Sequence, residues 1–183
     1  MNLIRSVSDL VQALDRGERV KYLLFWGHQP GREGAVDKAC LSQWYPASFE
    51  VDDTMYPSAE HFMMAEKARL FGDTEAIGRI LDASHPGAAK RIGREVRGYN
   101  ETAWSAVRVD AVVRGNVAKF GQNAALAAFL LGTGERVLVE ASPVDAVWGI
   151  GLAAGDGRAQ NPSQWQGDNL LGFALMEARH RLS

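Results

Sequence analysis

The stretch Pro57-Ser-Ala-Glu-His-Phe-Met-Met-Ala-Glu-Lys-Ala-Arg-Leu-Phe-Gly72 marks the point where the chain turns from strand-like to helical patterning. Ser58 is a good N-cap, because its hydroxyl can accept a hydrogen bond from a free N–H of the first turn. Gly72 can end the helix, since glycine adopts the left-handed conformation that other residues avoid. We therefore expect one helix between these two residues.

Further helices are expected towards the C-terminus. Asp73, Asn100 and Asn123 stand where a helix can begin, because short polar side chains cap free N–H groups. Pro86 suits a first helical position, since its missing N–H would have no partner there. Apolar residues follow each of these starts at near-helical spacing. A terminal helix is expected over residues 170 to about 181.

Strand patterns are few and short. Residues 20–26, Val-Lys-Tyr-Leu-Leu-Phe-Trp, predict a buried strand, because aromatic and aliphatic side chains run together there. Phe49–Val51 and Thr54–Tyr56 flank Asp52-Asp53, a pattern that favours a hairpin. Residues 137–139 predict one further strand.

The expected fold is α+β, mainly helical, with these few short strands. A helix capped by Ser6 or Ser8 and ended by Gly17 completes it at the N-terminus. A length of 183 residues with 46% apolar content suits one sizeable core. We therefore expect a single domain over residues 1–183.

The composition limits the classes of function. With 20 Lys and Arg against 22 Asp and Glu, the net charge of -2 creates no strong field towards nucleic acid or an anionic membrane. Cys40 is the only cysteine, which excludes an intramolecular disulfide and a multi-cysteine metal site and favours a reducing compartment. No signal-peptide pattern or membrane-spanning apolar stretch is found. We expect a cytoplasmic protein with no membrane partner.

A carboxylate and an ammonium share one side of the helix that starts at Ser58. At 3.6 residues per turn, one face carries apolar sulfur side chains together with two charges, namely Glu60, Met63, Met64 and Lys67. An ionised Glu60 beside such a wall can stabilise an oxocarbenium-like transition state. It can equally be a surface acid favoured by the helix dipole, with Lys67 solvated. Spacing alone leaves both interpretations open.

His61, next to Glu60, also has two interpretations. A lone histidine beside a core is more often hydrogen-bonded structure, but the imidazole can also contact a substrate. The other histidines, His28, His85 and His180, are scattered, so no pair stands at metal-ligand spacing. We expect neither a metal nor a cofactor.

A long loop rich in Gly, Asp, Asn and Gln covers residues 141–168, and loops of this length are often functional. Near its start, Trp148 offers a stacking surface and Asp145 can hold a ribose hydroxyl. Gly149 and Gly151 would let backbone approach a ligand closely. The same residues also suit a glycine turn beside a core tryptophan, and their spacing lacks the full dinucleotide fingerprint.

A basic run, Lys90-Arg-Ile-Gly-Arg94-Glu-Val-Arg97, follows the helix start at Pro86. Lys90, Arg94 and Arg97 can share a helical face and receive a phosphate, with Arg as a bidentate donor. More often such a run is a solvated face. Acyl transfer has no support, because the chain has no Ser-His-Asp order or nucleophile elbow and Cys40 has no neighbouring base.

A series of short motifs, in order across nearly the whole chain, resembles the NADAR/YbiA-like family. They are Phe25-Trp-Gly27, Leu41-Ser-Gln-Trp-Tyr-Pro46 with Phe49, Pro57-Ser-Ala-Glu60-His61 through Lys67, Lys119-Phe-Gly-Gln-Asn123, Leu138-Val-Glu140, Asp145 through Gly151, and Asn169-Leu-Leu-Gly172 with Leu175-Met176. The chain departs from the family at Gln43 and Trp44, which replace Asn and Phe, and at residues 62–64, where Phe-Met-Met replaces Tyr-Phe-Gln. These changes lie beside the expected pocket and put the substrate in question.

The resemblance implies a NADAR/YbiA-like fold and hydrolysis of an N-glycosidic bond between ribose and a base-like amine. It gives preference to the catalytic interpretation of Glu60, with Lys67 and Asp145 as further catalytic candidates. The candidate substrate-binding residues are Trp44, His61, Arg94, Trp148, Gly149, Gly151 and Asn169. No metal and no cofactor are part of this expectation.

Two substrate classes are implied by the resemblance. One is the ribosylamino-pyrimidine phosphates of early riboflavin synthesis, and the other is ADP-ribose attached to guanine, free or in nucleic acid. Trp148 and Trp165 offer more stacking surface than a small pyrimidine needs, and Arg94 can accept a second phosphate, which favours guanine-linked ADP-ribose. Any surrounding nucleic acid would be held weakly at this net charge.

A different class of function stays open beside the enzyme. The chain can instead be a non-catalytic module that binds ADP-ribose or a related nucleotide through Trp148, the glycines and an arginine. Such a module has no need of a carboxylate, so the presence of both Glu60 and Lys67 favours the enzyme. The sequence does not fix the oligomeric state.

Overall fold

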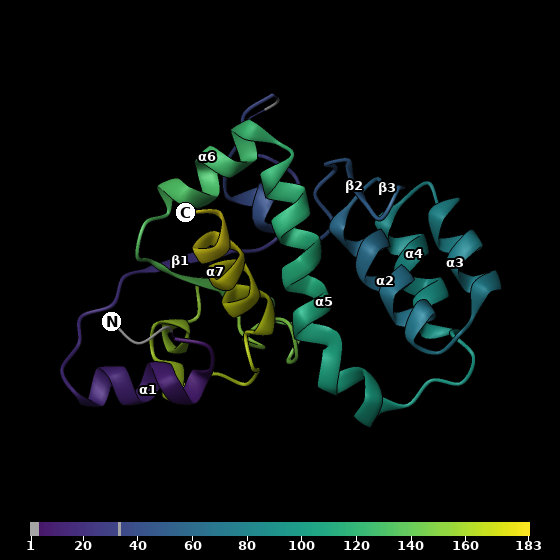
Figure 1. Cartoon of the computed structure of the whole chain (residues 1–183). Helices are drawn as coiled ribbons and strands as arrows, with labels where there is room; N and C mark the ends of the chain where they lie inside the picture. Colours follow the sequence, from purple (N-terminus) through teal and green to yellow (C-terminus); the bar gives the residue numbers. More distant parts are fainter. Residues whose placement is uncertain (1–3, 33) are drawn as a thin grey trace.

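The long helix α5 (Glu101–Gly121) runs through the middle of the computed structural model, which describes residues 4–32 and 34–183 (Figure 1). On one side of it lie three helices, α2 (Ala59–Leu70), α3 (Thr74–Leu81) and α4 (Pro86–Arg94). α5 packs against α2 from this group and against α7 (Leu170–Leu182) on its other side.

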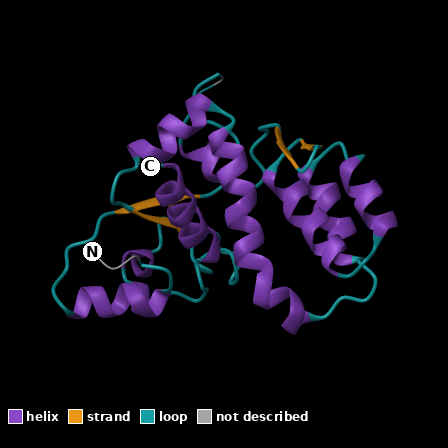
Figure 2. Ribbon diagram, viewed as in Figure 1, coloured by secondary structure: helices purple, strands orange, loops and turns teal. Residues whose placement is uncertain are grey.

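The second side of α5 holds the few strands of the parallel sheet and the N-terminal helix (Figures 1 and 2). Its elements are α1 (Val7–Asp15), β1 (Tyr22–Phe25), α6 (Ala124–Gly132) and β4 (Val137–Glu140). The predicted α+β, mainly helical fold is confirmed. No helix in residues 4–32 and 34–183 combines the length and apolar character needed to cross a membrane.

Helix starts follow the predicted caps. The side chains of Ser58, Asp73 and Asn100 each accept a hydrogen bond from the backbone N–H three residues later, which fixes the first turns of α2, α3 and α5. Asn123 also precedes a helix, α6, but its amide donates to the carbonyls of Ser48 and Lys119 and makes no cap.

The predicted strand over residues 20–26 is too long. β1 pairs in parallel with β4, from Tyr22 beside Val137 to Phe25 beside Glu140. The pairing stops there because β4 ends at Glu140. Trp26 therefore lies beyond the ladder, and it is 59% exposed where the sequence predicted burial.

The predicted hairpin is confirmed. β2 (Phe49–Val51) pairs antiparallel with β3 (Thr54–Tyr56). Between them Asp52 and Asp53 have φ of 49° and 57°. Positive φ at both central residues is the requirement of a type I′ turn, whose twist matches that of the strands.

Helix α7 packs closely against β4, the strand that ends at Glu140. At Gly172 an added Cβ would lie 2.1 Å from the Leu138 carbonyl oxygen, so only glycine fits. We expect Gly172→Ala to destabilise the fold by at least about 1–3 kcal/mol, because backbone must move. Thermal unfolding would show a midpoint lower by several degrees.

The matched control is Gly132→Ala, at the end of α6. A Cβ there meets nothing within 4 Å, so its midpoint should be unchanged or higher. Equal midpoints for the Gly172→Ala protein and the wild type would contradict this account of the β4–α7 contact.

Candidate functional site

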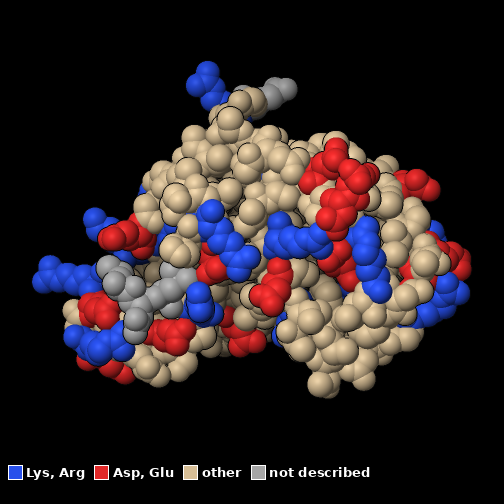
Figure 3. All heavy atoms as spheres, viewed as in Figure 1, with Lys and Arg blue, Asp and Glu red and all other residues tan. Residues whose placement is uncertain are grey.

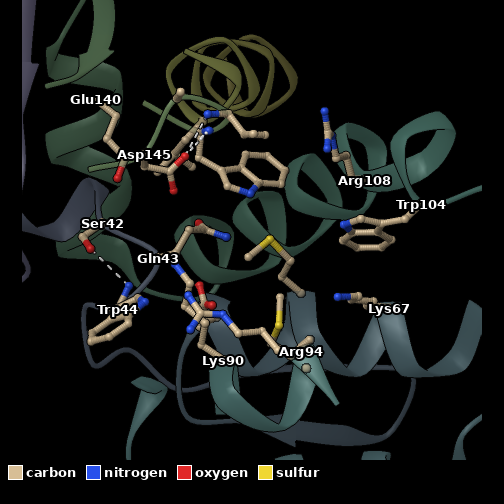
Figure 4. Close-up of a pocket in the computed structure, with 18 of the residues that line it drawn as sticks. Ser42, Gln43, Trp44, Lys67, Lys90, Arg94, Trp104, Arg108, Glu140 and Asp145 are labelled. Carbon is tan, nitrogen blue, oxygen red and sulfur yellow. Dashed lines mark hydrogen bonds between the residues drawn. The ribbon is translucent and has the colours of Figure 1, made fainter. Parts of the chain in front are cut away.

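A cavity of about 460 Å³ opens between the two sides of the molecule, beyond the C-terminal end of β4. We call it the Glu60 cavity. In Figure 4, Glu140 and Asp145 enter from above, Trp44, Lys90 and Arg94 from below, and Lys67, Trp104 and Arg108 from the right. The remaining lining comes from the following residues: Ser42, Gln43, Glu60, Met63, Met64, Gly93, Tyr99, Glu101, Val144, Ala146, Val147, Trp148 and Leu171.

A second hollow of about 750 Å³ adjoins the first, and we call it the Trp26 hollow. The two share one wall, made by Ser42, Trp44, Lys90, Arg94, Glu140, Val144 and Asp145. The far side of the Trp26 hollow is formed by Trp26, His28 and Arg91, together with Gly27, Gly87 and Ser142. An aromatic and cationic surface thus continues outward from the Glu60 cavity.

Glu60 lies in the first turn of α2, and its backbone N–H donates to the Gln43 carbonyl at 3.0 Å. Its side chain is buried, and no described residue makes a hydrogen bond to Oε1. Burial raises the pKa of Glu60 to about 7; the negative charge of Asp145 adds to the rise, while Lys90 and the Trp44 side chain oppose it. The surface-acid interpretation is therefore wrong.

Lys67 lies on the same face of α2, two turns further along, and lines the same cavity. Its Nζ stands 4.1 Å from the centroid of the Tyr99 ring. Burial lowers the pKa of Lys67, Glu101 opposes the change, and Arg94 adds to it. The predicted sharing of one face by Glu60 and Lys67 is confirmed.

Glu140 is a site residue that no role was predicted for. It is the last residue of β4, lines both the Glu60 cavity and the Trp26 hollow, and has a buried Oε2 with no hydrogen bond from the described residues. Burial, together with the negative charges of Asp145 and Glu60, raises the pKa of Glu140 to about 8, and Lys90 opposes the rise. The signal in the sequence was a lone acid closing the apolar strand Val137-Leu-Val-Glu140.

Asp145 and Trp148 both line the Glu60 cavity, as predicted positions beside a ligand. Asp145 Oδ1 accepts the backbone N–H groups of Val147 at 2.9 Å and Trp148 at 2.8 Å (Figure 4). This turn presents the indole to the cavity.

The two loop glycines have a different place from the one predicted. A Cβ at Gly149 would lie 2.9 Å from the Glu140 carbonyl oxygen, and Gly151 has φ of 68°. Neither lines the Glu60 cavity or the Trp26 hollow. Gly149 lets the loop fold back on β4, and Gly151 lets it pass close to Gln166, so both close approaches are to protein and not to a ligand.

His61 and Asn169 also lie away from the cavity. His61 is 1% exposed, with Nδ1 2.7 Å from Ser58 Oγ and Nε2 2.9 Å from the Ala83 carbonyl oxygen. Asn169 Oδ1 accepts the Glu140 N–H, and its Nδ2 donates to the Leu138 carbonyl, both at 2.9 Å. Their hydrogen-bonding groups are used within the protein, so these two residues support the site and do not line it.

Trp44, Lys90 and Arg94 are brought to the shared wall as a cationic and aromatic group. Arg97, which was expected on the same helical face, is not part of it. α4 ends at Arg94, and Arg97 binds the Asp73 carboxylate at 2.6 Å. Trp165 is absent from the wall too, because its ring packs on Tyr22 and its Nε1 donates to the Ala159 carbonyl.

Two buried polar residues hold the segment that carries Trp44. Lys119 Nζ donates to the carbonyls of Cys40 and Ser42, at 2.7 and 2.8 Å. The Asn116 amide donates to Gln43 Oε1 at 2.9 Å. Within the described residues, no group of three or more His, Cys, Asp or Glu side chains is placed to hold a metal ion.

Comparisons with a family model and with known proteins give the same family. The NADAR domain model matches residues 24–183. The chain is 41% identical to N-glycosidase R617 of Acanthamoeba polyphaga mimivirus over 167 residues, which is 88% of this chain and 96% of that one. N-glycosidase YbiA of Escherichia coli is 35% identical over 134 residues, 73% of this chain and 75% of that one.

A solved structure and a longer relative add to this. The NMR structure of E. coli YbiA superposes with a TM-score of 0.68 at 30% identity, covering 88% of this chain and 84% of that one. Riboflavin biosynthesis protein VVA0006 of Vibrio vulnificus is 37% identical over 145 residues, which is 78% of this chain but 35% of that longer protein.

Proposed function

Because the chain belongs to the NADAR domain family and resembles N-glycosidases over most of its length, we propose that the Glu60 cavity hydrolyses the N-ribosidic bond of a phosphorylated ribosyl-base compound. The observation that carries the proposal is the Glu60 carboxyl, which is 2% exposed and has an Oε1 atom without a hydrogen bond from the described residues. A buried polar atom without a partner costs stability, so this Oε1 is suited to a contact with a bound substrate.

The chemistry needs a negative charge in this place. When the bond between the ribose C1′ and the base nitrogen breaks, positive charge develops on C1′ and the ring oxygen. The Glu60 carboxylate can stabilise that charge, and burial strengthens the interaction because the local dielectric constant is low. With a pKa of about 7, a large part of the Glu60 side chains is ionised at neutral pH.

The other walls suit the rest of such a substrate. Trp148 and Trp44 offer aromatic faces on which a base can stack. Lys90 and Arg94 bring positive charge to the shared wall, where a phosphate can be bound. Asp145 faces the cavity as a carboxylate for a ribose hydroxyl, with one oxygen held by backbone N–H groups.

Between the two substrate classes, the Trp26 hollow favours guanine-linked ADP-ribose. Trp165 no longer supports this choice, since it packs on Tyr22. The hollow instead adds about 750 Å³ beside the Glu60 cavity, with an exposed indole and Arg91. A ribosylamino-pyrimidine phosphate has one base and one phosphate to place, whereas an ADP-ribosyl-guanine compound has two bases and a pyrophosphate.

Any contact of this protein with nucleic acid would involve only a few residues around the target base. On the face drawn in Figure 3, basic and acidic side chains are intermixed and form no continuous basic patch. With a net charge of -2, a polynucleotide around the target base would be held by few ion pairs and released by moderate salt.

Side-by-side turnover tests the choice of substrate. We expect ADP-ribosyl-guanosine to be cleaved with a higher kcat/KM than a ribosylamino-pyrimidine phosphate. Replacing Trp26 with Ala should raise KM for the guanine-linked compound by about 5-fold or more, the value of one lost stacking contact. The same variant should leave KM for the pyrimidine compound nearly unchanged. Product identification by mass spectrometry would establish that the N-ribosidic bond is broken.

The outcomes separate the levels of the proposal. If only the pyrimidine compound is consumed, the choice of guanine-linked ADP-ribose as substrate is refuted, but the proposed N-glycosidase activity stands. Cleavage of neither compound would refute the N-glycosidase itself. The control variant is Trp26→Phe, which keeps an aromatic face in the hollow and should behave like the wild type.

A further inference from the structure

Glu140 is held so that only its side chain is free to act. Its N–H donates to Asn169 Oδ1 at 2.9 Å, and its carbonyl accepts the Ile150 N–H at 2.9 Å. The residue is also the last pair of the β1–β4 ladder, opposite Phe25. Figure 4 shows its carboxyl directed between Ser42 and Asp145, towards the shared wall. The buried Oε2 has no hydrogen bond within the described residues.

A second carboxyl group in this cavity has a direct chemical consequence. Glu60 comes from α2, Asp145 from the loop after β4, and Glu140 from β4 itself. The charge of Asp145 raises the pKa of both glutamates, and the charge of Glu60 also raises the pKa of Glu140. Lys90 is the cation that opposes the rise at Glu140, and Arg94 shares its wall. The other charged or titratable groups that line the two hollows are His28, Arg91, Lys67, Tyr99, Glu101 and Arg108. Acids that repel one another in a buried site retain a proton on one of them.

The proton is expected on Glu140. Burial raises its pKa to about 8, against about 7 for Glu60. Their positions differ too, because Glu60 lines only the Glu60 cavity, whereas Glu140 also lines the Trp26 hollow, where a base can stack. This difference in environment is the one that separates acid and base roles in two-carboxylate glycosidases.

We propose that Glu140 is the catalytic residue that protonates the departing base, while Glu60 stabilises the sugar. The inference rests on the proposed N-glycosidase function. As the C1′–N bond breaks, its electron pair goes to the base nitrogen, and the Glu140 carboxyl proton neutralises the base. The sugar cation is captured by water, directly or after transient attachment to Lys67. The proton lost by water passes through the Glu60 carboxylate back to Glu140, so the net reaction consumes one water.

Leaving-group dependence tests this role. A nucleobase leaves poorly as an anion and needs the proton, whereas 4-nitrophenolate is stable without it. The two probes are the substrate that the wild-type protein cleaves and its 4-nitrophenyl analogue with the same sugar phosphate. For Glu140→Gln we expect kcat to fall about 10²-fold or more with the base and less than about 3-fold with nitrophenol. The loss of activity above the alkaline limit of the wild-type pH profile should also disappear.

Two further variants complete the experiment. Glu135→Gln removes an exposed acid just before β4 and should match the wild type with both probes. Glu140→Asp keeps an acid and should recover part of the activity with the base. Equal losses with both probes would show a structural role and overturn the proposal, and so would wild-type rates for Glu140→Gln. A wild-type protein that cleaves neither probe would instead refute the proposed function.

Discussion

Glu60→Gln is expected to keep the fold and to lower turnover by about 10²-fold or more. Gln nearly conserves the volume of Glu, so the first turn of α2 and its hydrogen bond to the Gln43 carbonyl should remain. A neutral amide supplies no negative charge to a developing oxocarbenium ion. The measurement is kcat on a substrate that the wild-type protein cleaves, with far-UV circular dichroism as the test of folding.

Glu66→Gln is the matched control for this variant. Glu66 lies on the same helix but pairs with Arg69 and Arg114 outside the Glu60 cavity. Its loss should cost at most about 1 kcal/mol of stability and no activity, as for partly exposed ion pairs. Near-wild-type turnover by a folded Glu60→Gln protein would remove this carboxylate from the mechanism.

The pH dependence of stability gives an independent reading of the Glu60 environment. Because the folded pKa is raised to about 7 from 4.5, the folded state favours the protonated acid. That contribution is fully present below about pH 4.5 and is lost as the pH rises through about 7. Relative to Glu60→Gln, the wild type should therefore lose about 3 kcal/mol between pH 4 and pH 9, at 1.36 kcal/mol per pKa unit. Urea unfolding at several pH values would measure the difference.

Much of the fold could be predicted from local signals. Helices start at Ser58, Asp73 and Asn100 because each side chain accepts a hydrogen bond from a backbone N–H of the first turn. That N–H has no partner within the helix, so the signal is local. The extent of β1 could not be predicted in the same way. Its end depends on where the partner strand β4 stops, more than a hundred residues away, and apolar character continued past that point to Trp26.

The residues of the site also fall into two groups, those that local sequence patterns predict and those that only the tertiary fold brings together. Glu60 and Lys67 could be found together because helical periodicity alone places them on one face. Glu140, Lys90 and Trp26 come from separate parts of the chain, and only the tertiary fold brings them around the Trp26 hollow. Motif membership also selected residues such as His61 and Asn169, whose polar atoms bind other parts of the protein.

The same helical face makes Lys67 the second residue whose loss should be severe. Of the two routes by which the sugar is captured, we propose the one through Lys67, in which the amine attacks C1′ and holds the ring-opened sugar as a Schiff base until water releases it. Lys67→Met should then lower turnover by about 10²-fold. Burial lowers the pKa of Lys67, a shift in the direction that favours the neutral amine needed for such an attack. Met keeps the apolar contacts of the stem but has no nucleophilic nitrogen.

Borohydride separates this covalent role from simple ion pairing. A protonated Lys67 could only bind phosphate or face the ring of Tyr99, over which its Nζ lies. If the Schiff base forms, borohydride added during turnover reduces the iminium to a stable secondary amine, and peptide mass spectrometry should find the sugar on Lys67. Lys21→Met removes an exposed lysine before β1 and should retain full activity and the adduct. No adduct in the wild type, together with retained activity in Lys67→Met, would make Lys67 a spectator and leave water as the group that captures the sugar.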